Sequence, residues 1–136
     1  MEYYADESDF QISSNGKIQE YSGKLKELII PDTINGIVVT GIDDYAFSNN
    51  TQITSMTVPE SLTTVGCESF LLSSIKHFTA PGLTDIYESG FDHSSLIYIY
   101  APNLKYVEDY GLCGVKVNTI DFPKLEYAGN AAFAGW

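Results

Sequence analysis

Basic residues are scarce in this sequence. Seven lysines and arginines stand against eighteen aspartates and glutamates in 136 residues, which gives a formal net charge of −11. Nucleic-acid affinity depends mainly on basic side chains that neutralise phosphates, and anionic lipid surfaces attract the same side chains. The charge therefore argues against nucleic acid and against membrane insertion or a lipid surface, whereas a basic partner or a divalent cation would be tolerated.

Cysteines and long apolar runs are also scarce. The repeat described below places Cys67 and Cys113 two repeats and about 10 Å apart, beyond the ~7 Å limit between the Cα atoms of a disulfide. We interpret both as small residues in or near the core. No apolar run approaches the ~20 residues of a membrane span, and the acidic start, Met1 to Asp9, lacks the features of a signal peptide. Either the protein is cytoplasmic or its targeting segment is missing from this sequence.

Regularly spaced prolines reveal an internal repeat. Pro59, Pro81, Pro102 and Pro123 are separated by 22, 21 and 21 residues, and Pro31 precedes them. Alignment on the prolines brings apolar residues into six columns over five units. The columns read Leu25, Ile53, Ile75, Leu96, Val117; Leu28, Met56, Phe78, Ile99, Ile120; Ile30, Val58, Ala80, Ala101, Phe122; Ile34, Leu62, Leu83, Leu104, Leu125; Ile42, Val65, Ile86, Val107, Ala128; and Phe47, Phe70, Phe91, Leu112, Phe133.

Each unit predicts a short strand that ends at its proline. Apolar residues alternate there with period two, and proline has no N–H to give to a strand ladder. A second extended segment is expected between the fourth and fifth columns, followed by a turn or one short helical turn that reaches the phenylalanine column. Because one unit cannot bury its own apolar face, the units must stack in parallel around a continuous core. The prediction is a β-rich leucine-rich-repeat solenoid, a parallel sheet of stacked coils of about 21 residues.

The first 24 residues predict an N-terminal cap, in one domain over residues 1–136. The segments 10–13 and 17–21 flank Ser14-Asn15-Gly16, a strong hairpin signal, and this β-hairpin would shield the first coil and its strand edge. An insertion around residues 35–39 lengthens the first unit and carries an Asn-Gly turn signal.

Residues 25–136 predict five repeats, the last of them incomplete. The chain stops part-way through a coil. Three interpretations are open: Trp136 folds over the end of the core, the protein continues, or two copies associate end to end through the uncapped C-terminal edge. We favour continuation.

These residues resemble a known family. The run from Ile30 to Phe47, followed by Ile53–Pro59 and Val65–Phe70, resembles the BspA-like class of bacterial leucine-rich repeats, whose unit reads roughly L-x-x-I-x-I-P-x-x-V-x-x-I-G-x-x-A-F. The resemblance covers about residues 25–135. It implies a parallel solenoid on bacterial surfaces, secreted or within larger adhesins, that binds proteins or host components. The consensus glycine is kept at Gly66 and Gly129 but is replaced in the units between them, and no specific contact residues carry over.

Catalytic constellations are missing from the pattern. His77 and His93 are the only histidines, one in a predicted strand and one in the loop after the phenylalanine column. Neighbouring columns assemble no Ser-His-Asp or Cys-His pair, and there is no Gly-rich phosphate loop and no Cys/His cluster at metal spacing. We therefore expect a protein that is not an enzyme and has no cofactor.

An acidic column is a weak candidate for a metal site. Asp44, Glu88 and Asp109 share this column, and carboxylates stacked roughly 5 Å apart could hold Ca²⁺. The column is interrupted by Cys67 and ends in Asn130. We favour a solvated turn without metal.

The outward positions of the predicted strands form the face that a ligand would meet. Tyr98 and Tyr100 stand out because tyrosine is favoured at binding hot spots, although ordinary strand propensity also explains them. The candidate ligand-binding residues are Tyr98, Tyr100, His77, Thr79, Thr57 and Asp121.

Two functions are open at this point. The first is a non-catalytic domain that binds a protein or a glycan, as part of a bacterial surface or secreted recognition protein. The alternative is a structural spacer from a longer solenoid with no ligand of its own. The resemblance favours an extracellular or cell-surface location, and the cytoplasm stays open.

Overall fold

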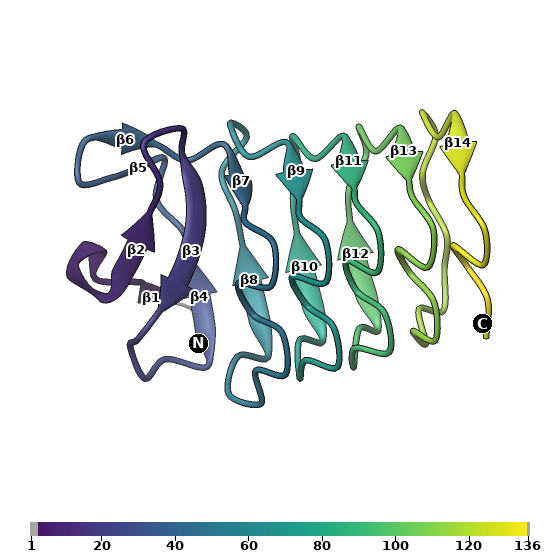
Figure 1. The fold of residues 1–136 in the computed structure, drawn as a ribbon, viewed down its shortest axis with the longest axis horizontal. Helices are drawn as coiled ribbons and strands as arrows, with labels where there is room; N and C mark the ends of the chain where they lie inside the picture. The colour runs from purple at the N-terminus through teal and green to yellow at the C-terminus, as the bar shows by residue number, and fades with distance from the viewer. Residues whose placement is uncertain (1–2, 136) are drawn as a thin grey trace.

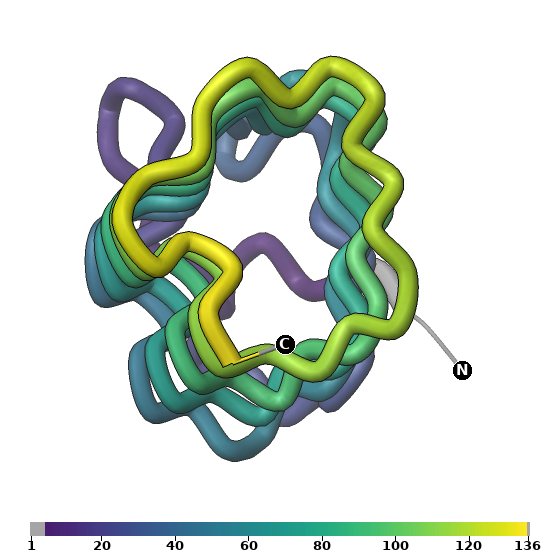
Figure 2. Tube along the Cα trace, turned by 90° about the vertical axis from the view of Figure 1, so that its right-hand side faces the viewer, coloured from purple at the N-terminus to yellow at the C-terminus, as the bar shows by residue number. Residues whose placement is uncertain are grey.

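The chain folds as a solenoid of stacked coils. The structure is a computed structural model that describes residues 3–135. Successive coils follow one another along the long axis (Figure 1) and superimpose when the molecule is viewed down that axis (Figure 2). Each regular coil contributes one strand to a first sheet and one strand to a second sheet. Its remaining segment forms turns, and these turns stack from coil to coil into a third side of the solenoid, which we call the turn wall. The predicted fold class is confirmed.

Both large sheets are built from strands of two to five residues. Among the described residues, the first sheet is parallel throughout and comprises β1 (Tyr3–Tyr4), β4 (Glu27–Ile29), β8 (Ser55–Thr57), β10 (His77–Thr79) and β12 (Tyr98–Tyr100). The second sheet comprises β2 (Phe10–Ile12), β3 (Lys17–Tyr21), β7 (Gly41–Ile42), β9 (Thr64–Val65), β11 (Asp85–Ile86), β13 (Tyr106–Val107) and β14 (Tyr127–Ala128). Parallel pairing of equivalent strands follows directly from a repeat in which every coil winds the same way.

The predicted cap hairpin is present. β2 and β3 pair antiparallel, and β3 continues in parallel with β7, so the hairpin extends the second sheet beyond the first coil. The short 3-10 helix η1 (Glu7–Asp9) precedes it. The predicted Asn-Gly turn is also present, since Asn35 and Gly36 join the antiparallel strands β5 (Thr33–Ile34) and β6 (Ile37–Val38).

Stacked phenylalanines fill the interior as the repeat requires. Phe70 lies between Phe47 and Phe91, with ring centroids 5.3 and 4.8 Å apart and interplanar angles of 11° and 1°. Phe78 of β10 meets both Phe70 and Phe91 edge-on, at 5.5 and 5.2 Å. Aromatic pairs in these geometries stabilise the core beyond the burial of their surface. The phenylalanine column therefore lies in one shared core.

Within residues 3–135 the turn wall contains turns and no helical turn. Tyr45, Phe47 and Asn49 donate their backbone N–H groups to the following coil, to Cys67, Ser69 and Leu71, at 2.7–2.9 Å. The residues between them bond within their own coil, as in Ala46 N–H to Asp43 C=O at 3.3 Å. Two columns of the wall have left-handed backbones, with φ between 51° and 83°. They read Tyr45, Glu68, Ser89, Tyr110, Ala131 and Asn49, Leu72, His93, Gly114, Gly135.

One predicted strand does not form. Residues 119–121 were expected to be the fifth strand of the first sheet, but they have no strand structure, and Ile120, assigned to the core, is 56% exposed. The fifth strand is instead β1, at the other end of the sheet. Val115 is fully buried, whereas Val117 is only partly buried. In this coil the last fully buried residue is therefore Val115, two residues before Val117 of the aligned apolar column.

The strand fails to form because, among the described residues, backbone hydrogen bonds to the preceding coil are missing. Lys116 donates its N–H to the C=O of Leu96 at 3.1 Å, and within residues 3–135 no backbone hydrogen bond joins residues 117–121 to β12. Without these bonds residues 117–121 are not held in register with β12, and Ile120 is left outside the core. In the last coil the predicted core residue Ala128 is also exposed. Trp136, which one of the three interpretations placed over the end of the core, lies outside the described residues.

Candidate functional site

The first sheet brings most of the candidate ligand-binding residues together. Parallel register places His77 beside Tyr98, and Thr79 beside both Tyr100 and Thr57. The rings of His77 and Tyr98 have centroids 6.3 Å apart. Side chains alternate across a strand, so these residues share the outer face while Phe78 and Ile99 point into the core. Tyr98 and Tyr100 are 49% and 45% exposed and dominate this face.

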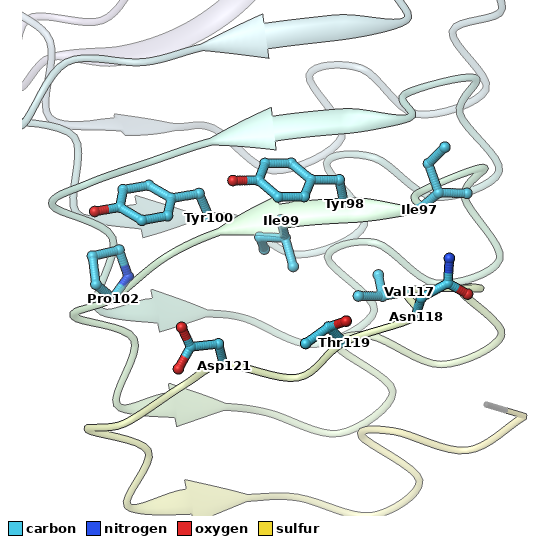
Figure 3. Close-up of a pocket in the computed structure, with 9 residues that line it drawn as sticks. All are labelled: Ile97, Tyr98, Ile99, Tyr100, Pro102, Val117, Asn118, Thr119 and Asp121. Atoms are coloured by element: carbon cyan, nitrogen blue, oxygen red, sulfur yellow. The ribbon is translucent and has the colours of Figure 1, made fainter.

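Asp121 lies across a groove from the tyrosines. Because residues 117–121 do not pair with β12, a groove of about 440 Å³ opens between them (Figure 3). It is lined by Ile97, Tyr98, Ile99, Tyr100, Pro102, Val117, Asn118, Thr119 and Asp121. Among the described residues that line the groove, Asp121 is the one with a charged side chain. His77 and Thr79 lie on the neighbouring strand β10 and Thr57 lies one strand further away on β8, and none of the three lines the groove.

Strand β12 presents an open backbone edge to this groove. Tyr98 donates its N–H to Lys76, and the C=O of Tyr100 accepts from Ala80. In a parallel strand, alternate residues direct their backbone groups to opposite sides. The N–H and C=O of Ile99 therefore point toward residues 117–121, where no hydrogen bond within residues 3–135 meets them. The sequence pattern could not reveal this edge, because it predicted a strand there.

Two of the three carboxylates in the acidic column, Asp44 and Asp109, hold neighbouring coils together. Oδ1 of Asp44 accepts the N–H of Cys67, and Oδ1 of Asp109 accepts the N–H of Asn130, both at 2.8 Å. Each carboxylate thus bridges to the next coil. Among the described residues, Asp44, Glu88 and Asp109 do not form a cluster of potential metal ligands.

A different cluster of potential ligands lies elsewhere on the turn wall. Asp92, His93 and Cys113, here called the Asp-His-Cys cluster, place ligand atoms within 4.8 Å of one another. Nδ1 of His93 is 2.5 Å from Oδ1 of Asp92. The expectation that neighbouring columns hold no Cys-His pair is therefore wrong. The signal was in the spacing: Asp92 and Cys113 are 21 residues apart and so occupy one column.

Burial raises the pKa of the Cys113 thiol above its usual value, and the negative charge of Asp92 adds to this rise. A nucleophilic cysteine needs the opposite shift, since the thiolate is the reactive form. The pKa of the other free cysteine, Cys67, is also raised by burial and by nearby carboxylates, Asp44 first among them. Both shifts lower the fraction of reactive thiolate at neutral pH.

No helix within residues 3–135 has both the length and the hydropathy needed to cross a lipid bilayer.

The chain was compared with solved structures, curated proteins and models of protein families. One similar solved structure is a leucine-rich cell surface protein from Faecalibacterium prausnitzii A2-165, with 18% sequence identity and a TM-score of 0.40. The match covers 93% of this chain and 50% of that one, so the chain spans about half of that protein's length. No match was found among curated proteins.

The family comparison is the decisive one. The model of the BspA-type leucine-rich repeat region matches residues 15–136 with six copies, which is most of the chain. The resemblance seen in the proline-aligned columns is confirmed, and the solenoid of parallel strands agrees with it. This chain belongs to the BspA-type leucine-rich repeat family.

Proposed function

We propose that this domain is a non-catalytic binding module whose ligand is an extended polypeptide segment, held on the first sheet at the groove beside β12. The open backbone edge of β12 carries the proposal. An extended peptide can add to such an edge as a further strand, with main-chain hydrogen bonds supplying affinity and alternate side chains supplying specificity. A glycan offers no repeating N–H and C=O pattern to match that edge, so a polypeptide is favoured over a glycan.

The side chains around the edge fit this ligand. Tyr98 and Tyr100 provide broad contact surface with little rotamer entropy to lose, as at many binding hot spots. Asp121 faces them across the groove, and the chain has a net charge of −11. A peptide with a lysine or arginine near the position facing Asp121 is therefore the best match. His77, Thr79 and Thr57 extend the contact surface along the sheet.

Family membership supports an extracellular or cell-surface location, because repeats of this type are typical of surface and secreted bacterial proteins. The competing proposal, a spacer within a longer solenoid, predicts no ligand for this face. The two proposals differ in one observable, which is binding at the first sheet.

The test is an array of immobilised peptides with alternating Thr and Val, carrying one Lys, one Glu or no charge, beside an array of bacterial and host glycans. We expect the wild-type domain to bind the Lys peptides best. Tyr98→Ala with Tyr100→Ala should weaken binding at least tenfold, because loss of a hot-spot residue costs about 2 kcal/mol or more. Asp121→Asn should remove the preference for Lys.

The matched control is Tyr106→Ala with Tyr127→Ala. These tyrosines are also exposed and adjacent on neighbouring strands, but they lie on the second sheet. This variant should bind like the wild type. Binding of glycans alone, or equal losses in both double variants, would contradict the proposal. No binding to either array would favour the spacer.

A further inference from the structure

We infer that Asp92, His93 and Cys113 form a surface site for a transition-metal ion of the Zn²⁺ type, with at least one coordination position open to solvent. Neither family membership nor the proposed peptide-binding face assigns such a site. It lies on the turn wall and uses none of the residues of the groove.

Stacking of the coils brings Asp92 and Cys113 into contact. They occupy one column of the turn wall, where Leu71 precedes them. Equivalent residues of adjacent coils lie about 4.8 Å apart, so the carboxylate and the thiol become neighbours without any special loop. The N–H of His93 donates to the C=O of Cys113 at 2.8 Å, which fixes the backbone around both. Two of the ligands are therefore set by the repeat itself.

Backbone conformation directs the third ligand. His93 has a left-handed backbone with φ of 51°, and its side chain is turned toward the next coil. There it lies over Gly114: a Cβ on that glycine would be 2.9 Å from both Cδ2 and Nε2 of the imidazole. Any side chain at position 114 would displace the ring. Glycine in the next coil thus makes the space in which the imidazole lies beside Cys113.

The ligand set has the chemistry of a zinc site. Thiolate, imidazole and carboxylate are the three side-chain types that bind Zn²⁺, and three protein ligands plus water is the arrangement of zinc sites with an open position. Tetrahedral bonds of about 2.0–2.3 Å hold ligand atoms roughly 3.3–3.8 Å apart. These separations lie between the 2.5 Å Asp92–His93 contact and the 4.8 Å limit of the cluster. Small side-chain rotations are enough to close the site.

Exposure fits an accessible site as well. The side chains of His93 and Asp92 are 62% and 16% exposed, so an ion can enter without opening the coil. Binding would replace the proton of the Cys113 thiol by the metal and release that proton to solvent, because the thiolate is the ligand. Ca²⁺ and Mg²⁺ prefer sets made only of oxygen and should not compete.

The experiment uses the full chain without a histidine tag, in a reducing buffer free of chelators. Titration with Co²⁺ reports the ligand through thiolate-to-metal charge-transfer absorption, and Zn²⁺ affinity follows from competition with a chelating dye. We expect one ion per chain, with a charge-transfer band that Zn²⁺ abolishes. Cys113→Ser should eliminate the band and weaken Zn²⁺ binding at least tenfold, and His93→Gln should weaken it similarly.

The chain supplies its own controls, since it has one further cysteine and one further histidine. Cys67→Ser and His77→Gln should keep both the band and the affinity. Gly114→Ala keeps all three ligand residues but displaces the imidazole and places an alanine in a left-handed backbone, so it should weaken binding while circular dichroism shows the fold intact. If Cys113→Ser does not fold, alkylation of Cys113 in the folded Cys67→Ser variant provides the same comparison. Absence of the band, or binding retained after both Cys113→Ser and His93→Gln, would overturn the site.

Discussion

Single residues explain why the consensus glycine is kept in some coils only. In the coil before Gly66, an aspartate, Asp44, stands one position after the glycine column. In the coil before Gly129, Asp109 stands at the same position. A Cβ on Gly66 would lie 2.6 Å from Oδ1 of Asp44, and one on Gly129 would lie 2.3 Å from Oδ1 of Asp109. The glycine therefore makes room for the carboxylate that accepts an N–H from the next coil.

Gly66→Ala tests this pairing. The added methyl group should displace the Asp44 carboxylate from the N–H of Cys67 and lower the free energy of unfolding by about 1–3 kcal/mol, as measured by urea denaturation. In the double variant with Asp44→Ala the two costs should not add, because both changes remove the same hydrogen bond. Glu108→Ala, in the same column as Gly66, should change stability by less than about 0.5 kcal/mol. Additive losses would show that the pair is independent.

Left-handed backbones recur at two positions of every coil, mostly at residues other than glycine. A left-handed conformation costs roughly 1–2 kcal/mol for a residue with a Cβ, whereas glycine adopts it freely. Ser89, with φ of 55°, carries this cost. Ser95 follows in the same coil and is not among the described residues with positive φ.

Ser89→Gly should therefore raise the free energy of unfolding by roughly 0.5–1 kcal/mol, because the relief of strain exceeds the added chain entropy. Ser95→Gly should lower it by a similar amount, since no strain is relieved there. Thermal or urea unfolding of the two variants gives the comparison directly. Equal losses at both positions would mean that the left-handed turn carries no strain.

At the level of elements, the sequence predicted what the repeat determines and missed what changes between repeats. The burial of Leu28, Met56 and Phe78 follows from period-two alternation before a proline. The failure at Ile120 could not be predicted, because its apolar pattern matches that of the other units and the sequence does not report the missing hydrogen bonds to β12. The Asp-His-Cys cluster was missed for a related reason: it depends on a left-handed histidine and a glycine one coil later, which apolar columns do not report.

The unpaired edge of β12 should affect the rate of amide hydrogen exchange. The N–H of Ile99 points into the groove without a partner among residues 3–135, whereas β10 has strands on both sides. Backbone amides exchange slowly only when their hydrogen bonds must open first. In the free domain, the Ile99 amide should exchange with deuterium at least about tenfold faster than the Phe78 amide, as measured by NMR.

A peptide that adds to the edge should slow the exchange of Ile99 and leave Phe78 unchanged. Amide exchange is also measured in the variant with Tyr106→Ala and Tyr127→Ala, which shows how substitutions on the second sheet affect the exchange of Ile99 and Phe78. Equal protection of Ile99 and Phe78 without ligand would show that residues 117–121 close onto β12 as a strand, as the sequence pattern had suggested.

For the whole molecule, the net charge of −11 acts against the compact state through self-repulsion. Salt screens charges over about 10 Å at 0.1 M. NaCl should therefore raise the urea midpoint between low and moderate ionic strength. CaCl₂ at equal ionic strength should have the same effect as NaCl, because Asp44 and Asp109 are engaged with backbone N–H groups. A specific rise with Ca²⁺ would revive the acidic column as a cation site.

Hydrogen bonds hold each coil to its neighbours along three separate walls of the solenoid, which are the first sheet, the second sheet and the turn wall. Between residues 108 and 129 one wall is open at the groove, yet β13 still pairs with β14, and the turn wall still bonds Tyr110 to Asn130 and Leu112 to Ala132. A coil can thus give up a strand and keep its place in the stack. A gap in one of these walls costs the fold the hydrogen bonds of that strand and the burial of Ile120, so the same frame can open a groove at one coil and remain closed at the coils beside it.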